Sequence, residues 1–130
     1  APALAIPRAL SRAGLPSADV YEINEAFACV PLVATKLLSN QRFLTSDYNE
    51  MVKEASTKPI LDNDDTKYQE LKSKLNVNGS AIAVGHANTA SGSRIMMTAA
   101  YNLKENGGGY AACAICGGLT QGAGCIIWVE

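Results

Sequence analysis

Hydrophobic residues at helical spacing open the chain, and a short alternating segment follows. The apolar positions in residues 6–13 predict a helix in which Pro7 is tolerated in the first turn and Gly14 ends the helix. Residues 20–24 alternate between two faces as a short strand does. The chain therefore begins with a helix and then a strand.

A second helical stripe occupies residues 25–38. A proline in a helix interior costs about 3 kcal/mol, so Pro31 is expected either in the first turn or at a kink. From residue 39 to residue 75 the chain carries more than half of its charged residues and only weak apolar stripes. This composition predicts a polar surface excursion at about 39–75 and not a second domain.

Two short amphipathic helices are predicted within this excursion. The first covers residues 48–55 and is opened by Asp47, with Glu50 completing a capping box. The second covers residues 68–75, where Glu70 and Lys74 form a pair at i, i+4.

The last third of the chain predicts one helix followed by two strands. Apolar residues cover most of the girth of a helix around residues 95–103, so this helix is expected to be buried and to end at the glycines 107–109. The apolar runs 110–116 and 123–129 predict two buried strands joined by a tight glycine-rich turn. Together the elements predict an α/β fold with a mixed β-sheet layered with helices.

Composition and charge limit the size of the fold and its partners. A chain of 130 residues that is 48% hydrophobic is expected to form a single domain over residues 1–130, or one half of a larger fold. Eleven basic residues against twelve acidic ones give no reason to expect nucleic-acid binding.

No apolar run approaches the roughly 20 residues that cross a bilayer, and no secretory pattern opens the chain. We expect no membrane partner and a cytoplasmic location, and the missing initiator Met suggests a fragment.

The only histidine, His86, follows a small apolar run that is predicted to be a strand, and small residues after it begin the predicted buried helix. The positive end of a helix dipole disfavours the imidazolium, so a neutral ring that donates one hydrogen bond is expected. Two interpretations stay open. His86 is either a core histidine bonded to backbone carbonyls, or a catalytic group beside which small side chains let a substrate approach.

Cys113 and Cys116 form a CxxC motif, but residues three apart on a strand point to opposite faces. A zinc or disulfide site is therefore disfavoured, and no metal is expected. Cys116 ends a strand where glycines expose backbone N–H groups, so its thiol is placed to exchange protons beside donors for an oxyanion. The alternative is a small buried residue beside a turn, which we expect for Cys113 and Cys125.

Asn24 stands at the predicted junction between the first strand and the second helix. Its side-chain oxygen is placed to accept a backbone N–H as a helix N-cap. On position alone, capping outweighs a catalytic role.

Three ordered motifs resemble the carboxy-terminal half of thiolases, the acyl-CoA acyltransferases that make or cleave 3-oxoacyl-CoA. They are NEAFA at residues 24–28, NVNG-x-AIA-x-GH-x4-SG-x-R at residues 76–94, and C-x-G with a later glycine at Cys116, Gly118 and Gly122. The resemblance covers nearly the whole chain except residues 39–75. It implies the carboxy-terminal half of a thiolase-like fold.

The resemblance also implies roles for particular residues. Asn24 would hold a catalytic water, and His86 would activate a nucleophilic cysteine and donate to the thioester oxyanion. Cys116 would be the general acid/base, and the backbone N–H of Gly118 would help form a second oxyanion hole. The substrates would be CoA thioesters, with no metal or organic cofactor beyond the CoA that they carry, and the protein would be a homo-oligomer, a dimer or tetramer.

Several positions depart from the pattern usual in the family. Ala87 and Thr89 replace a proline and a glycine after the histidine, and Ser80 replaces a glycine before it. Leu119 and Thr120 stand where glycine is common. These changes leave the reacting groups in place and alter the stiffness of the loops and the shape of the pocket.

Thiolases carry their acyl group on a cysteine of the amino-terminal half, and no residue here corresponds to it. The chain is therefore expected to be inactive alone and to need that half, in the same chain or as a separate subunit. The leading hypothesis is the catalytic carboxy-terminal half of an acetyl-CoA acetyltransferase or 3-oxoacyl-CoA thiolase. The alternatives are a non-catalytic thiolase-like module for acyl-CoA binding or assembly, and a zinc or thiol–disulfide module.

Overall fold

A three-stranded mixed sheet forms the centre of the computed structural model, which describes residues 1–40, 43–44, 64–119 and 121–130. The strands are β1 (Val20–Ile23), β2 (Gly109–Cys116) and β3 (Gly122–Val129), in that spatial order. β1 runs parallel to β2, and β2 runs antiparallel to β3. The predicted mixed α/β sheet is therefore confirmed.

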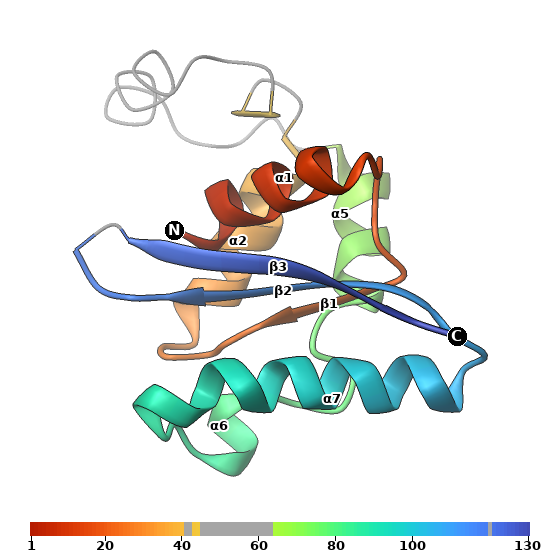
Figure 1. Cartoon of the computed structure of the whole chain (residues 1–130). Coiled ribbons are helices and arrows are strands. Elements are labelled where there is room, and N and C mark those ends of the chain that lie inside the picture. The colour runs from red at the N-terminus through yellow and green to blue at the C-terminus, as the bar shows by residue number, and fades with distance from the viewer. Residues whose placement is uncertain (41–42, 45–63, 120) are drawn as a thin grey trace.

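Helices cover both faces of this sheet (Figure 1). One face packs against α1 (Pro2–Ala13) and α2 (Cys29–Leu38), and α7 (Ser91–Glu105) lies on the other. Two core clusters correspond to these layers, one built around Ile6, Ile23 and Ala112 and the other around Ile95 and Cys113. Because both faces are covered, all four residues of β1 are buried.

The helices α1 and α2 begin at residues other than those expected. α1 starts at Pro2, so Pro7 lies inside the helix and not in its first turn. Gly14 ends α1 with a left-handed φ of 68°, as predicted. α2 starts only at Cys29, which places Pro31 in its first turn, where the missing N–H breaks no helical hydrogen bond.

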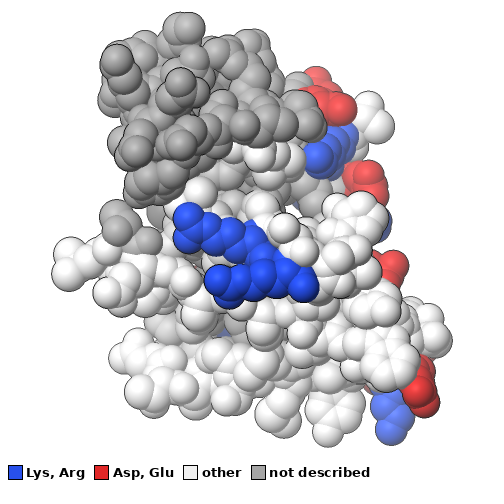
Figure 2. All heavy atoms as spheres, turned by 45° about the horizontal axis from the view of Figure 1, so that its top comes forward, with Lys and Arg blue, Asp and Glu red and all other residues white. Residues whose placement is uncertain are grey.

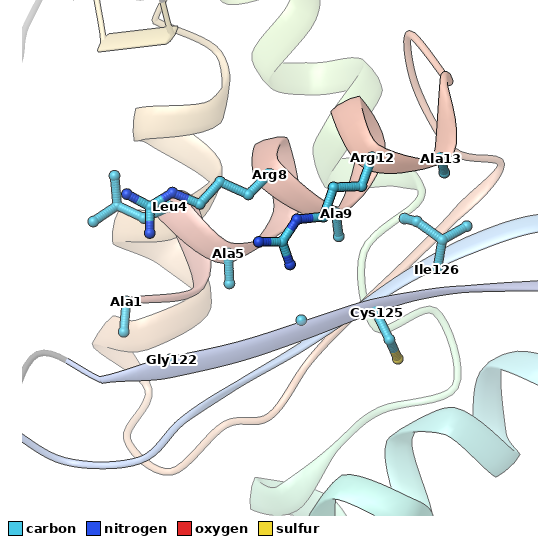
Figure 3. A pocket seen from close by; sticks show the side chains of 11 residues that line it. Ala1, Leu4, Ala5, Arg8, Ala9, Arg12, Ala13, Gly122, Cys125 and Ile126 are labelled. Atoms are coloured by element: carbon cyan, nitrogen blue, oxygen red, sulfur yellow. The ribbon is translucent and has the colours of Figure 1, made fainter. Parts of the chain in front are cut away.

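Small residues let α1 approach β3 closely. Figure 3 shows Ala1, which precedes α1, and Ala5 and Ala9 of α1 turned toward the strand, with Arg8 and Arg12 projecting beside the groove between helix and strand. β3 has no fully buried residue, in contrast to the buried strand that was expected.

Two expectations for the segment around His86 are wrong. The apolar run before it forms the short helix α6 (Ala81–Val84) and not a strand. α7 buries one stripe only, while Met97 and Tyr101 are 58% and 63% exposed, so α7 is an amphipathic helix.

The helix α5 (Asp65–Ser73) lies within the segment 39–75, which was predicted to be a polar surface excursion. The Asp64 side chain caps it by accepting the N–H of Lys67 at 3.1 Å. The predicted pair of Glu70 and Lys74 is confirmed at 2.7 Å. The helix predicted at residues 48–55 lies outside the described residues.

The surface in Figure 2 is mostly uncharged, with small separate groups of Lys and Arg or of Asp and Glu side chains among the described residues. None of the helices in the described part of the chain is long and apolar enough to cross a membrane.

Candidate active site

The carboxyl ends of β1 and β2 and the amino end of α7 meet at one edge of the sheet (Figure 1). Asn24 follows β1, and its backbone N–H donates to the carbonyl of Ala114 at 2.9 Å, which extends the pairing with β2 by one residue. Cys116 ends β2. His86 precedes the 3-10 turn η1 (Asn88–Ala90), which leads directly into α7. Three predicted site residues thus belong to one edge of the fold.

Asn24 is completely buried and faces α7. Its Oδ1 accepts a hydrogen bond from Nη2 of Arg94 at 2.9 Å, and its Nδ2 lies 3.4 Å from Nδ1 of His86. The N-cap expectation is wrong, because α2 begins four residues later than the predicted stripe and its N-cap is Ala28. The side chain instead joins two residues that lie 62 and 70 positions away along the chain.

Two side chains hold the imidazole of His86 at the same ring nitrogen. Oγ of Ser91 lies 2.7 Å from Nδ1, and Nδ2 of Asn24 lies 3.4 Å from it. His86 is exposed, and within the described residues no hydrogen-bond partner meets its Nε2. The interpretation as a core histidine bonded to backbone carbonyls is therefore wrong, and the ring has one nitrogen anchored and one available.

A hydrogen-bonded loop fixes the position of α6 and of the histidine that follows it. The side chain of Asn76 bonds to both the N–H and the C=O of Ile23, at 2.8 and 2.9 Å. The carboxylate of Glu25 accepts from Nδ2 of Asn76 at 3.3 Å and from the backbone N–H of Ile82 at 3.0 Å. Gly85, with a φ of 95°, then turns the chain toward His86.

Two charged residues lie next to the Asn24 side chain, the completely buried Glu22 and the half-buried Arg94. Glu22 is completely buried, and neither of its carboxylate oxygens has a hydrogen-bond partner among the described residues. Burial raises the pKa of Glu22 to about 7, although the positive charge of Arg94 lowers it. Nη2 of Arg94 also donates to Oγ of Ser80 at 3.2 Å, while its Nε is buried without a partner among those residues.

Cys116 lies half-buried at the end of β2, where it is paired with Gly122. The turn is closed by hydrogen bonds between Gly117 and Gln121 and between Gln121 and Gly118, and Gly118 has a φ of 77°. Strand alternation gives Cys116 the same face as Ala114, which packs toward α1 and α2. The structure thus brings His86 and Asn24 into contact on the α7 side, and leaves Cys116 at the same edge, on the strand face that packs toward α1 and α2, without a hydrogen bond to either.

Cys113 is a core residue, as expected. It is 2% exposed in the cluster beneath α7, its Sγ lies 4.0 Å from the carbonyl of Ile95, and burial raises the pKa of its thiol. All four cysteines are free. No group of three or more His, Cys, Asp or Glu side chains suited to a metal ion occurs in the part of the chain that the structure describes.

Comparisons with known proteins decide the family. Residues 1–129 match the family described as "Thiolase, C-terminal domain". The chain belongs to this family. This thiolase C-terminal domain is 39% identical over 123 residues to a probable acetyl-CoA acetyltransferase of Mycolicibacterium smegmatis, covering 93% of this chain and 24% of the relative. It is 37% identical over 129 residues to a β-ketoadipyl-CoA thiolase of Acinetobacter baylyi, covering 98% of this chain and 25% of the relative.

The fold of this thiolase C-terminal domain is similar to that of a solved acetyl-CoA acetyltransferase from Syntrophomonas wolfei. The TM-score is 0.68 with 29% sequence identity, over 99% of this chain and 27% of that one. The thiolase C-terminal domain described here therefore spans about a quarter of the length of the relatives it matches.

Three residues that were not predicted as site residues, Glu22, Ser91 and Arg94, surround Asn24 and His86. Ser91 and Arg94 belong to the second motif but were given no role. Their i, i+3 spacing puts both on one side of α7, toward His86 and Asn24. Glu22 lies within a four-residue strand covered on both faces, and a charged residue at such a position indicates a buried polar network.

Proposed function

We propose that this thiolase C-terminal domain supplies the acid/base and oxyanion groups of an acetyl-CoA acetyltransferase or 3-oxoacyl-CoA thiolase. The observation that carries the proposal is the contact of His86 with Asn24 and Ser91 at the edge of the sheet where β2 ends in Cys116. The relatives named acetyl-CoA acetyltransferase and β-ketoadipyl-CoA thiolase support acyl transfer between CoA thioesters.

In the synthetic direction, the thiolate of Cys116 takes a proton from the acetyl carbon of acetyl-CoA, and the electrons of the C–H bond move onto the thioester oxygen as an enolate. The enolate carbon then attacks the acyl thioester on the cysteine of the amino-terminal half. A C–C bond forms, the cysteine leaves as a thiolate, and 3-oxoacyl-CoA is released. Thiolysis by CoA is the reverse of this sequence.

Three groups donate hydrogen bonds to the negative oxygens that form during these steps. Nε2 of His86 and a water on Nδ2 of Asn24 face the enolate oxygen, and the backbone N–H of Gly118 faces the oxyanion of the acyl-transfer step. The N–H of Gly118 makes no hydrogen bond to any described residue, which leaves it available for this role. Each donor of this kind contributes about 3 to 4 kcal/mol to transition-state stabilisation.

The partner in this mechanism is an amino-terminal thiolase half that carries the nucleophilic cysteine. Large apolar side chains flank the site residues along the sequence: Phe27 is 73% exposed, Ile82 is 65% exposed and Leu119 is 96% exposed. Exposed apolar surface near a site favours coverage by another part of the protein or by the substrate. The chain alone is proposed to be inactive, and the complete enzyme to be a homo-oligomer that acts on acetoacetyl-CoA and longer 3-oxoacyl-CoA.

The test joins this chain to its natural amino-terminal half and measures thiolysis of acetoacetyl-CoA. Cys116→Ser is expected to abolish turnover, whereas Cys125→Ser, which changes another half-buried cysteine, is expected to keep most of it. Activity that survives Cys116→Ser would overturn the proposed role of that residue. A joined protein that binds acetoacetyl-CoA without turning it over would favour a non-catalytic thiolase-like module.

A further inference from the structure

We propose that Arg94 sets the tautomer of His86 through the side-chain amide of Asn24. Arg94 would then be a positioning residue, acting on the ring without touching the substrate. The catalytic importance of the tautomer rests on the proposed function of His86. The chain of hydrogen bonds from α7 to the ring does not depend on it.

The first step is the orientation of the Asn24 amide. A guanidinium has five N–H donors and no acceptor, and it stays protonated in proteins. The Asn24 atom at 2.9 Å from Nη2 of Arg94 must therefore be the oxygen Oδ1. Rotation of the amide by half a turn would place two donors, Nδ2 of Asn24 and Nη2 of Arg94, against each other at a completely buried side chain, which is unfavourable.

The second step is the protonation of the ring. With Oδ1 turned to Arg94, the amide hydrogens of Asn24 face Nδ1 of His86 across 3.4 Å. A proton on Nδ1 would then meet another donor, so the neutral ring carries its proton on Nε2. Ser91 does not decide between the tautomers, because its hydroxyl at 2.7 Å both donates and accepts. With Nδ1 unprotonated, the Ser91 hydroxyl donates to it.

The third step is the fixed position of Arg94 itself. Nη2 also donates to Oγ of Ser80 at 3.2 Å, and the guanidinium lies close enough to the buried Glu22 to affect its titration. Arg94 and Ser91 are three residues apart on α7, so one helix face holds both the amide partner and the ring partner. The position of α7 against β1 thus fixes the whole chain of contacts.

The consequence is that Nε2 of the neutral His86 ring is a donor to an incoming oxygen. Loss of Arg94 frees the Asn24 amide to rotate, and the ring then populates both tautomers. In the proposed reaction this removes an oxyanion donor from a fraction of the molecules and leaves substrate binding nearly unchanged.

The test is ¹⁵N NMR of histidine side chains in the full-length protein containing this chain, at a pH where the ring is neutral. Signals of His86 are identified by their loss in His86→Gln. The wild-type ring is expected to show a protonated Nε2 and an unprotonated Nδ1. Arg94→Met is expected to give a mixture of tautomers, Arg94→Lys to restore most of the wild-type pattern, and Arg12→Met, at an exposed arginine of α1, to leave it unchanged.

Asn24→Asp keeps an acceptor for Arg94 and turns a second oxygen toward the ring, so it is expected to move the proton to Nδ1. If Arg94→Met fails to fold, Asn24→Asp still tests whether the side chain at position 24 controls the tautomer of His86. A wild-type ring protonated on Nδ1 would overturn the inference, and so would a folded Arg94→Met with an unchanged tautomer.

Kinetics separate this inference from the proposed function. In thiolysis of acetoacetyl-CoA, Arg94→Met is expected to lower kcat roughly 10- to 100-fold, by analogy with the loss of hydrogen-bond partners that orient metal-binding histidines, with KM changed by less than about twofold. If the wild-type protein shows no thiolysis but the tautomer responds as stated, the proposed function fails and the role of Arg94 stands.

Discussion

Asn76 pairs with Ile23 through its side chain in the way that a neighbouring strand would. Oδ1 accepts the N–H of Ile23 at 2.8 Å, and Nδ2 donates to its C=O at 2.9 Å. The backbone N–H of Asn76 also donates to the carbonyl of Tyr21 at 2.9 Å. β1 therefore has no open edge next to Asn24, and the loop toward His86 starts from a fixed point.

Replacement of Asn76 by Ala is expected to destabilise the fold by about 2 to 3 kcal/mol. It leaves the N–H of Ile23 without its partner and the C=O with only the hydroxyl of Ser80 at 3.5 Å, and Ala fits poorly at a φ of 46°. Urea denaturation measures the loss. Asn78→Ala, at an exposed position two residues along, is the matched control and is expected to change stability by less than about 0.5 kcal/mol. Equal losses for the two variants would contradict this account.

The elements that were predictable from sequence have a strong local pattern. The glycine-rich turn between β2 and β3 and the end of α1 at Gly14 follow from glycine positions and apolar runs. The four residues of α6 were assigned to a strand because a short apolar run has no diagnostic period. Their helical turn is favoured by a distant group, the Glu25 carboxylate on the N–H of Ile82.

The contacts of the site could not be predicted, because they depend on packing between distant segments. Asn24 has the residue type and position of an N-cap, and only the later start of α2 frees its side chain. The contact with His86 joins positions 62 residues apart, and a local sequence pattern does not predict contacts between such distant positions. Family resemblance did predict both residues as site candidates.

Glu22 is expected to make stability depend on pH between about 4.5 and 7. Burial raises its pKa from 4.5 to about 7, so in this range the unfolded chain carries the charge while the folded protein keeps the proton. The stabilising contribution of the neutral carboxyl is fully present below pH 4.5, falls as pH rises and is lost above 7. A shift of this size corresponds to roughly 3 kcal/mol.

Urea denaturation at pH 4.5 and pH 8 measures this dependence in the wild type and in Glu22→Gln. The variant does not titrate at this position, so its stability is expected to fall by roughly 3 kcal/mol less over the interval. Glu105→Gln, at the exposed end of α7, is the control and should match the wild-type slope. Parallel profiles for Glu22→Gln and the wild type would show that Glu22 is already charged in the folded protein.

Gly124 allows the close approach of α1 to β3, and its replacement by Ala is expected to cost about 1 to 3 kcal/mol. A Cβ there would lie 3.0 Å from Cβ of Ala5 and 3.2 Å from its backbone C and O, so the helix must shift. Gly92→Ala, within α7, meets no atom within 4 Å and is expected to leave stability unchanged or raise it slightly. Thermal unfolding of the two variants compares them directly, and a neutral Gly124→Ala would mean that α1 adjusts freely.

Ser80 stands where the family usually has glycine, and the structure gives its hydroxyl two partners. Oγ accepts from Nη2 of Arg94 at 3.2 Å and lies 3.5 Å from the carbonyl of Ile23, to which it donates, and the residue is completely buried. Ser80→Ala is expected to lower the free energy of unfolding by about 1 to 2 kcal/mol, because it leaves the buried side of Arg94 with one acceptor fewer.

Ser93→Ala, at an exposed position of α7, removes a hydroxyl without such partners among the described residues and is expected to leave the free energy of unfolding unchanged or slightly higher. A double-mutant cycle with Arg94→Met isolates the contact of the hydroxyl with the guanidinium. Because Ser80 and Arg94 share a hydrogen bond, the two losses should be less than additive by about 0.5 to 1 kcal/mol. Full additivity would mean that Ser80 contributes only through the carbonyl of Ile23.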